Sequence, residues 1–492
     1  LNFDATGTAP LLVRYDDAGQ MTLNASYAGS TATADPGLTL SGADLFVSKP
    51  YGLCLQTDST CSSADENCTL FPGVRAGDSF PLRVRAVAWQ VDGEALTAAQ
   101  LCTGNLTTPN FAHSGILLSS AVQAPAGGAN GQMSPSNYAH ALGGQTAATT
   151  SISEVGVFNI IATPPAGAYL DGETVSGGSS ALVGRFIPAY LGAVGSASIT
   201  PSCGSAFSYQ GQPMDFTSGR QPSLALTGYN RAGGVTTNYD RGAFWKLAAP
   251  AVGSYSSFTG IAGLDARLLS QGSASLSVAG AGDGDGRRTY SWSGEQLVYQ
   301  AALSPSSDDY PFMAKLKQRF TAAVLTDVDG ACHGTGGACT DYSFDFTDLP
   351  GSEVRLGRLR IGNAHGSELQ SLSLPVALET WQNIAGGSFQ AEGLDTCTTS
   401  SVLGTPELFN YTGNLGATET SPSLVAPVAG VGRVQLSAPG SGNDGSVQVR
   451  FASAPNWLHY PWNGTTRQAA VGLASFGIYK GAVPLIFRRE LY

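Results

Sequence analysis

The chain has 492 residues, of which 12% are charged, and its 36 acidic and 25 basic residues give a formal net charge of −11 at pH 7. This acidic balance, with no basic stripe along the chain, argues against a nucleic-acid binder. The 63 glycines and 26 prolines, set between short apolar alternations, are typical of many short strands joined by turns in more than one domain.

The first element along the chain is a sequence motif, called a phrase below, that occurs twice. RYDDAGQMTLNASY (residues 14–27) places an acidic residue before a glycine, an apolar alternation and a tyrosine, and ISEVGVFNIIATPPAGAYL (152–170) repeats that order. Two further phrases return in the same order at offsets of roughly 134 to 140 residues: FVSKPYG (46–52) as GRFIPAY (184–190), and segment 76–93 as segment 209–234. The chain is therefore predicted to be a tandem array of related modules.

We predict an all-β fold of tandem immunoglobulin-like β-sandwich modules with disulfide-pinned loops. The expected divisions are an incomplete module of terminal strands, two β-sandwich modules and one or more C-terminal β-sandwich modules: 1–47, 48–186, 187–305 and 306–492. Unpaired strands in the first segment need a partner, because they expose backbone N–H and C=O groups. The partner could be this chain's later modules, a part lost by processing, or a neighbouring subunit through β-strand addition.

Several segments alternate apolar and polar residues with the period of a strand. In segment 80–86 the even-numbered positions are apolar and the odd ones include two arginines, so one face would be buried. Segment 312–324 looks helical at first sight, but its apolar residues share one parity and its lysines the other. We therefore predict strands there, and also in 372–378 and 447–451.

The eight cysteines indicate an oxidising compartment, because they lack the C-x₂₋₄-C pairs with nearby histidines that zinc sites show. Cys332 and Cys339 are predicted to form a local disulfide. The spacing leaves the partners of the other six open: Cys54, Cys61, Cys68, Cys102, Cys203 and Cys397.

Two loops place aspartates two residues apart, as the start of a calcium loop does. In AGAGDGDGRR, Asp283 and Asp285 precede an arginine that cannot bind a cation, so a solvated hairpin turn is the better interpretation. Asp327 and Asp329 lie beside the predicted disulfide loop and are the candidate calcium ligands. A disulfide-pinned surface loop without metal is the alternative, and no other cofactor is predicted.

The aromatic phrase NWLHYPWNG is the candidate binding surface. It packs Trp457, Tyr460 and Trp462 into nine residues, which would suit the stacking of carbohydrate or a protein contact if the rings are exposed. Burial of these rings in a core is the alternative. An array of carbohydrate-binding modules is therefore the second functional hypothesis.

Motifs of known catalytic sites are absent from the sequence. It contains no G-x-S-x-G, H-E-x-x-H, C-x-x-C or P-loop, and its five histidines are scattered singly. Enzyme activity is therefore not predicted. A secreted hydrolase remains the least favoured hypothesis, because catalytic triads are recognised by geometry rather than by order along the chain.

The last third of the chain resembles a known family. Segments 352–381 (SEVRLGRLRIGNAHGSELQSLSLPVALETW), 394–398 (LDTCT) and 474–492 (ASFGIYKGAVPLIFRRELY) resemble the C-terminal region of the MshQ family. That family is named for the biogenesis locus of the mannose-sensitive haemagglutinin pilus, a type IV pilus of Gram-negative bacteria. Upstream phrases such as AGDSFPLRVRAVAW and TNYDRGAFWKL also look like the family's pattern. The resemblance implies an exported surface protein linked to pili or adhesion, without established catalytic residues.

We therefore expect an extracellular structural or adhesive protein of a bacterial surface appendage, on the surface of a Gram-negative cell. The expected partners are pilus or filament subunits, further copies of the chain, and surface glycans, but not nucleic acid. No membrane span is expected, because no segment approaches the roughly 20 apolar residues that a spanning helix needs. The first residues lack the pattern of a signal peptide, so an exported chain would already have lost its signal.

Overall fold

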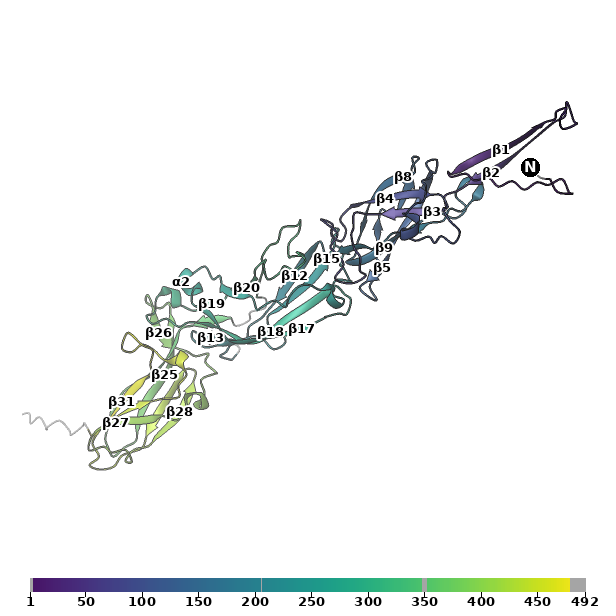
Figure 1. Ribbon diagram of the computed structural model, residues 1–492. Coiled ribbons are helices and arrows are strands. Elements are labelled where there is room, and N and C mark those ends of the chain that lie inside the picture. Colours follow the sequence, from purple (N-terminus) through teal and green to yellow (C-terminus); the bar gives the residue numbers. More distant parts are fainter. Residues whose placement is uncertain (1–2, 205, 347–351, 478–492) are drawn as a thin grey trace, which may run out of the picture.

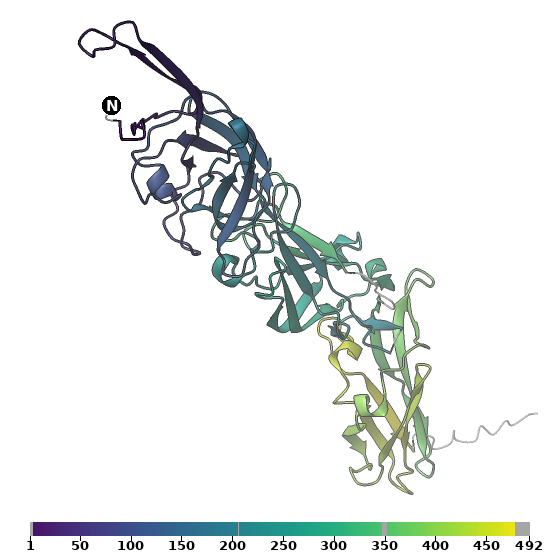
Figure 2. The ribbon, with the colours of Figure 1, turned by 90° about the vertical axis from the view of Figure 1, so that its right-hand side faces the viewer.

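A computed structural model describes residues 3–204, 206–346 and 352–477. The chain forms an elongated array, with a long hairpin projecting at one end and a β-sandwich at the other (Figures 1 and 2). The described helices are single turns: α1 (Ala98–Leu101), α2 (Ala262–Asp265), α3 (Ser400–Leu403) and the 3-10 turns η1 (Leu170–Gly172), η2 (Gly242–Phe244), η3 (Ser307–Asp309) and η4 (Asn456–Leu458). No helix in these residues is long and apolar enough to cross a membrane.

The projecting element is the hairpin of β1 (Gly19–Ala28) and β2 (Thr39–Ser48), which pair antiparallel along their whole length. Successive side chains of β1 alternate between its two faces, so Met21, Leu23 and Tyr27 lie on the same face. Among the described residues, β1 has no strand neighbour other than β2. One edge and one apolar face of β1 are therefore open.

The second module, as we name residues 49–186, is a sandwich of two antiparallel sheets. One sheet has the order β3-β4-β8-β6, and the other the order β10-β9-β5-β7, with β11 also on β9. The strands are β3 (Gly52–Gln56), β4 (Phe80–Val87), β5 (His113–Ala124), β6 (Met133–Ser134), β7 (Asn137–His140), β8 (Gln145–Ile152), β9 (Gly156–Thr163), β10 (Gly178–Ser179) and β11 (Val183–Phe186). The predicted alternation of segment 80–86 is confirmed, because Phe80, Leu82 and Val84 are buried between the sheets.

In the third module, residues 187–355, three neighbouring strands of the main sheet, β12-β15-β18, correspond to β3-β4-β8 of the second, but the fourth strand, β14, precedes β15 in the chain whereas β6 follows β4. This main sheet has the order β12-β15-β18-β14, with β17 on β18, and two small sheets β16-β20-β21 and β13-β22-β19 accompany it. The strands are β12 (Tyr190–Ser196), β13 (Phe207–Tyr209), β14 (Met214–Asp215), β15 (Ser223–Tyr229), β16 (Ser254–Ser257), β17 (Leu268–Ala279), β18 (Arg287–Tyr299), β19 (Phe312–Met313), β20 (Leu316–Phe320), β21 (Tyr342–Asp345) and β22 (Glu353–Arg355). The recurrent phrases thus lie on equivalent strands, β4 and β15.

The fourth module, residues 356–477, is a sandwich of the sheets β23-β25-β29-β28, with β26 on β25, and β24-β31-β30-β27. The strands are β23 (Gly357–Ile361), β24 (Ala364–Gly366), β25 (Leu372–Gln382), β26 (Ser388–Ala391), β27 (Glu407–Gly413), β28 (Pro422–Val428), β29 (Val431–Leu436), β30 (Gly445–Arg450) and β31 (Val471–Phe476). Its core takes Leu374 and Val376 from one sheet and Val447 and Val449 from the other, as their alternation predicts. Residues 478–492, part of the MshQ-like motif, lie outside the described residues.

One predicted domain boundary, at 305/306, separates strands that pair in one sheet. Residues 254–257 pair as β16 with β20, which lies beyond the boundary expected at 305/306. The expected boundary at 305/306 instead contains the capped turn η3, where the Ser306 side chain accepts from the backbone N–H of Asp308. Asp309 is buried and forms an ion pair with Arg267. This polar residue therefore belongs to a packed turn and does not mark a boundary between modules.

The segment 312–324 is extended, as predicted, but only in part. Leu316 and Phe320 of β20 are buried, and the charged residues between them face outward or lie half-buried. The strand ends at Phe320, after which the chain turns, so the last apolar positions of the pattern belong to the turn. Alternation identified the strand type but not its end.

Candidate functional site

The residues that join one module to the next form polar contacts at three places along the described chain. At the first joint, between the hairpin and the second module, the carboxylate of Asp17 accepts from the backbone N–H of Asn110 at 3.1 Å and from its side-chain amide at 2.8 Å. Ala18, the next residue, is buried in the core of the second module. Gly19 then begins β1 with φ +144°. The hairpin is thus anchored to the second module at its base.

The second joint uses the same three positions of the repeated phrase. Glu154 accepts from the backbone N–H and hydroxyl of Thr237 at 2.9 and 3.0 Å and from the backbone N–H of Asn238 at 3.3 Å. Val155 is buried in the core of the third module, and Gly156 begins β9 with φ +138°. Burial raises the pKa of Glu154, although these bonds oppose the shift. The opening phrase therefore recurs because each copy joins one module to the following one.

The candidate calcium ligands lie at the second joint, where protein donors occupy both carboxylates. Asp329 forms a bidentate ion pair with Arg185 of β11, in which Nη2 of the arginine lies 2.9 Å from Oδ1 of the aspartate. Asp327 accepts from the backbone N–H groups of Asp329 and Ala331 and from the hydroxyl of Tyr239 at 2.7 Å. Burial raises the pKa of Asp327. The geometry assigns these residues to the joint, and calcium binding stays an untested prediction.

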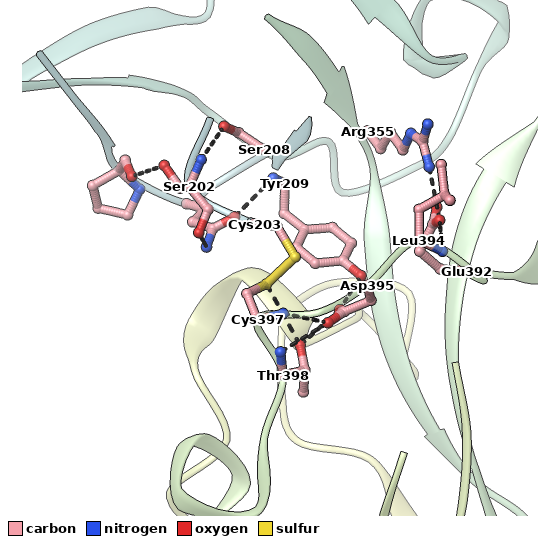
Figure 3. Close-up of a disulfide and its surroundings, with 12 residues drawn as sticks. Ser202, Cys203, Ser208, Tyr209, Arg355, Glu392, Leu394, Asp395, Cys397 and Thr398 are labelled. Carbon is pink, nitrogen blue, oxygen red and sulfur yellow. Dashed lines mark hydrogen bonds and ion pairs between the residues drawn. A yellow bond between two sulfur atoms is a disulfide. The ribbon is translucent and has the colours of Figure 1, made fainter. Parts of the chain in front are cut away.

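The third joint is covalent. Cys203 of the third module is bonded to Cys397 of the fourth, at a sequence separation of 194 (Figure 3). Beside it, the Tyr209 hydroxyl donates to Asp395 at 2.6 Å, and Thr398 donates to the same carboxylate through its backbone N–H and hydroxyl. Burial and the nearby Asp395 raise the pKa of Tyr209 well above its usual value. Tyr209 belongs to the core of the fourth module, although it lies on β13 of the third.

Further contacts cross the third joint beside this disulfide. Arg355, at the end of β22 in the third module, pairs with Glu392 of the fourth at 2.7 Å, and within its own module its guanidinium lies 4.3 Å from the ring centroid of Phe207. The indole of Trp381 donates to the carbonyl of Ser306 at 2.9 Å. The joint therefore combines a disulfide, an ion pair and hydrogen bonds.

All eight cysteines are paired. Cys332 is bonded to Cys339, the pair that the seven-residue spacing predicts. The partners left open by the sequence are Cys54 with Cys102, Cys61 with Cys68, and Cys203 with Cys397. The first two pin loops within the second module. The third could not be inferred from spacing, because it bridges two modules.

Another cluster of carboxylates lies at the turn between β17 and β18. Carboxylate oxygens of buried Asp240 and exposed Asp283 and Asp285 lie within 4.8 Å of one another. Asp240 accepts from the backbone N–H groups of Gly284 and Gly286 at 3.4 and 3.3 Å, and burial raises its pKa. The hairpin turn predicted for this loop is confirmed, and its bonds to Asp240 tie it to the loop of the second joint.

The predicted aromatic residues separate into two groups. Trp457 is half-buried and packs on the core of the fourth module, close to Gly211 of the third. Tyr460 and Trp462 instead end a series of rings that we call the aromatic row. Consecutive centroids in this row are 6.5, 5.2, 5.2 and 5.0 Å apart, in the order Tyr310, Trp381, Phe389, Tyr460 and Trp462.

A half-buried arginine packs against the rings of the aromatic row. The Arg358 guanidinium lies 3.7, 4.9 and 5.1 Å from the ring centroids of Phe389, Tyr460 and Trp462. It also pairs with Glu379 at 2.7 Å, and Glu379 binds Arg360 at 3.0 Å. Sequence analysis missed Arg358 and Glu379, because the alternation of β23 and β25 marks them only as positions opposite the core.

A cleft of about 410 Å³ lies at the end of the aromatic row. The residues that line it include Trp462, Arg360, Asn363 and Gln468, together with the segment 469–471. The side-chain oxygen of Asn363 accepts from the backbone N–H of Leu473 at 2.9 Å, which fixes the direction of its amide. The cleft thus places one exposed ring beside polar donors.

Models of one protein family match nearly the whole chain. They describe successive domains of DUF6701, a domain of unknown function: the first, Ig-like domain at residues 1–43, the second at 49–152, the third at 154–348 and the fourth at 355–491. The third of these matches begins at the second joint, at Glu154. Together with the observed sandwiches, the Ig-like first domain confirms the predicted tandem all-β fold.

No curated protein matches the chain significantly. Among solved structures, the cadherin-like domains 1 to 4 of zebrafish RET are similar over 82% of this chain and 84% of that chain, with 10% sequence identity and a TM-score of 0.23. A similarity of this size carries no argument about fold or function.

Proposed function

Because this chain belongs to the DUF6701 family and its successive domains are joined by buried contacts, we propose that it is a stiff structural or adhesive protein of the cell exterior. The observation that carries the proposal is the repeated joint: an acidic residue, a buried apolar residue and a glycine connect the hairpin to the second module and the second module to the third. Flexible linkers between independent domains expose polar chain instead. A stiff array can hold an adhesive surface away from the cell.

Two observations support an extracellular location. The chain has no free cysteine among the described residues, and its four disulfides are typical of proteins in oxidising compartments. The low charge content and the hydroxyl-rich surface strands suit a structural rather than a catalytic protein. The MshQ-like motifs lead us to extend the proposal to a pilus-associated protein of a Gram-negative bacterium.

Immunogold labelling of intact, unpermeabilised cells that express the protein tests this location. We expect antibodies raised against the purified chain to label the surface and its pili, and brief protease treatment of intact cells to remove the signal. An antibody to a cytoplasmic protein serves as the control. Label that appears only after lysis would overturn the extracellular proposal, and surface label away from pili would overturn the pilus association alone.

The hairpin supports a proposal about assembly. Aligning Gly19 with Gly156 makes Leu23 equivalent to Ile160, which is 0% exposed in β9, whereas Leu23 is 41% exposed. In the second module, β5 pairs antiparallel with β9 on the edge that is open in β1. A Cβ at Gly156 would lie 2.4 Å from the carbonyl oxygen of Ala124 in β5, but a Cβ at Gly19 meets nothing within 4 Å. Among the residues that the structure describes, none takes beside β1 the position that β5 takes beside β9.

We propose that this position receives an antiparallel strand from a neighbouring subunit, so that head-to-tail addition extends the array. Leu23→Lys puts a charge on the apolar face, and Asn24→Lys puts the same charge on the opposite face of the same strand. Light scattering and electron microscopy should show assemblies for the wild-type chain and for the Asn24 variant, and monomers for the Leu23 variant. Assembly that survives both Leu23→Lys and deletion of residues 1–47 would rule out the mechanism.

A further inference from the structure

The cleft at the end of the aromatic row has a composition that the joint contacts do not explain. Trp381 contributes its indole N–H to the third joint, but Trp462 lies at the far end of the row and remains 40% exposed. Its ring is fixed from below by Tyr460 and Arg358. A tryptophan held with one side toward solvent offers a flat, electron-rich surface at little cost in side-chain entropy.

The polar lining of the cleft supplies directed donors. Because the Asn363 oxygen already accepts from Leu473, its amide nitrogen is left to donate. Gln468 lies on the same wall and pairs with Tyr460 only through its backbone. Hydroxyl groups next to an apolar C–H face are the partners that such a set of donors beside an indole ring recognises. A sugar has both properties, because its C–H face packs on the ring while its hydroxyl groups accept hydrogen bonds.

The charges of the cleft favour an acidic sugar over a neutral one. Arg358 and Arg360 share the single carboxylate of Glu379, so this group carries one excess positive charge. The residues that line the cleft include Arg360 and no carboxylate. An arginine guanidinium is suited to bind a carboxylate through paired hydrogen bonds. This local charge is opposite in sign to the net charge of the chain.

We propose that this cleft binds a uronic acid residue of a surface polysaccharide, with the sugar ring on the Trp462 indole and its carboxylate on Arg360. Asn363 and Gln468 would donate to the hydroxyl groups of the sugar. The site lies in the fourth module, which is at the end of the array opposite the hairpin (Figure 1). The binding proposal stands on this cleft alone, and it does not depend on the stiffness of the joints.

Titration of the full chain with tetragalacturonate, followed by calorimetry and tryptophan fluorescence, tests the proposal. Galactotetraose, which lacks the carboxylates, is the matched neutral probe. We expect saturable binding of the uronate and at least tenfold weaker binding of the neutral sugar. Absence of saturable uronate binding, or equal affinity for both probes, would overturn the proposal.

Three variants separate the roles of the residues. Trp462→Ala should weaken uronate binding at least tenfold, and Trp462→Phe should retain part of it, because an aromatic surface remains. Arg360→Gln should reduce the affinity for the uronate to that for the neutral sugar. Trp89→Ala is the control, since Trp89 is 46% exposed on the second module, far from the cleft. Unchanged affinity in both Trp462→Ala and Arg360→Gln, with wild-type circular dichroism, would assign the binding to another surface.

Discussion

Glu154 and the Arg185–Asp329 pair show how single buried residues determine the strength of a joint. Removing one partner of a buried ion pair leaves the other charge without compensation, at a cost of about 3 to 5 kcal/mol. The exposed pair between Arg231 and Asp78, which crosses the same joint, contributes at most about 1 kcal/mol. The buried residues therefore dominate the second joint. Glu154 adds to them because its loss would leave backbone N–H groups of the loop 237–238 unpaired.

A buried histidine predicts how the second module responds to acid. Burial lowers the pKa of His140 to about 4, from its usual value of 6.5, and its ring packs on Phe111. The unfolded chain therefore binds a proton that the folded chain does not, so stability present above pH 6.5 is lost as the pH falls toward 4. We expect about 2 to 3 kcal/mol of unfolding free energy to be lost at pH 4.5 through this residue.

Urea unfolding at pH 7 and pH 4.5 measures this effect. His140→Gln should lose less stability between the two pH values than the wild-type chain, because the substituted side chain does not titrate. His365→Gln is the control, since His365 is exposed on β24. Equal losses in the wild-type chain and in the His140 variant would contradict the assignment.

At the scale of strands and turns, the repeated glycine has a testable role. Gly156 has φ +138°, and a Cβ there would lie 2.4 Å from the carbonyl oxygen of Ala124. Gly156→Ala should therefore combine backbone strain with a clash, lowering the stability of the second module by about 2 to 4 kcal/mol. Gly115→Ala is the matched control, because Gly115 also has positive φ but open space around it. Thermal unfolding should rank the Gly156 variant clearly below the Gly115 variant.

Local sequence patterns predicted the strands, but they could not predict which distant segments the strands and joints contact. The alternation in 80–86 and 372–378 reports burial on one face, which depends on neighbouring residues only. The bond between Glu154 and Asn238 joins positions 84 residues apart. Two copies of a sequence motif indicate a repeated structural element, but they do not indicate which residues that element contacts. The repeat was therefore predicted, and its function as a joint was not.

The candidate site was predictable to a similar extent. The cluster of aromatic residues in 457–462 identified the region, because three large rings within a short stretch are unusual. Their division into Trp457, which packs at the joint, and Trp462, which faces the cleft, depends on the path of the chain after η4. Arg360 and Asn363 reach the cleft from β23 and the segment after it, about a hundred residues earlier, so no local pattern could reveal them.

At the scale of the whole molecule, the disulfide of the third joint predicts the response to force. Cys203 and Cys397 are separated by 194 residues, and a chain pulled from its ends cannot extend the part between them. At about 3.4 Å per residue, that part would add about 650 Å of contour length when released. Single-molecule pulling of the Cys203→Ser, Cys397→Ser double variant should show this gain relative to the oxidised wild-type chain. Equal contour lengths would show that the disulfide does not form.

The central claim is that the described modules behave as one stiff array, and small-angle X-ray scattering of the oxidised chain, with its monomer separated from assemblies by size-exclusion chromatography, tests it most directly. The account predicts a scattering curve that a single elongated particle reproduces. It also predicts that the Glu154→Ala, Arg185→Ala double variant gives a broadened distribution of dimensions at unchanged mass, because its second joint is weakened. A wild-type curve that only an ensemble of bent conformations can reproduce would contradict the account.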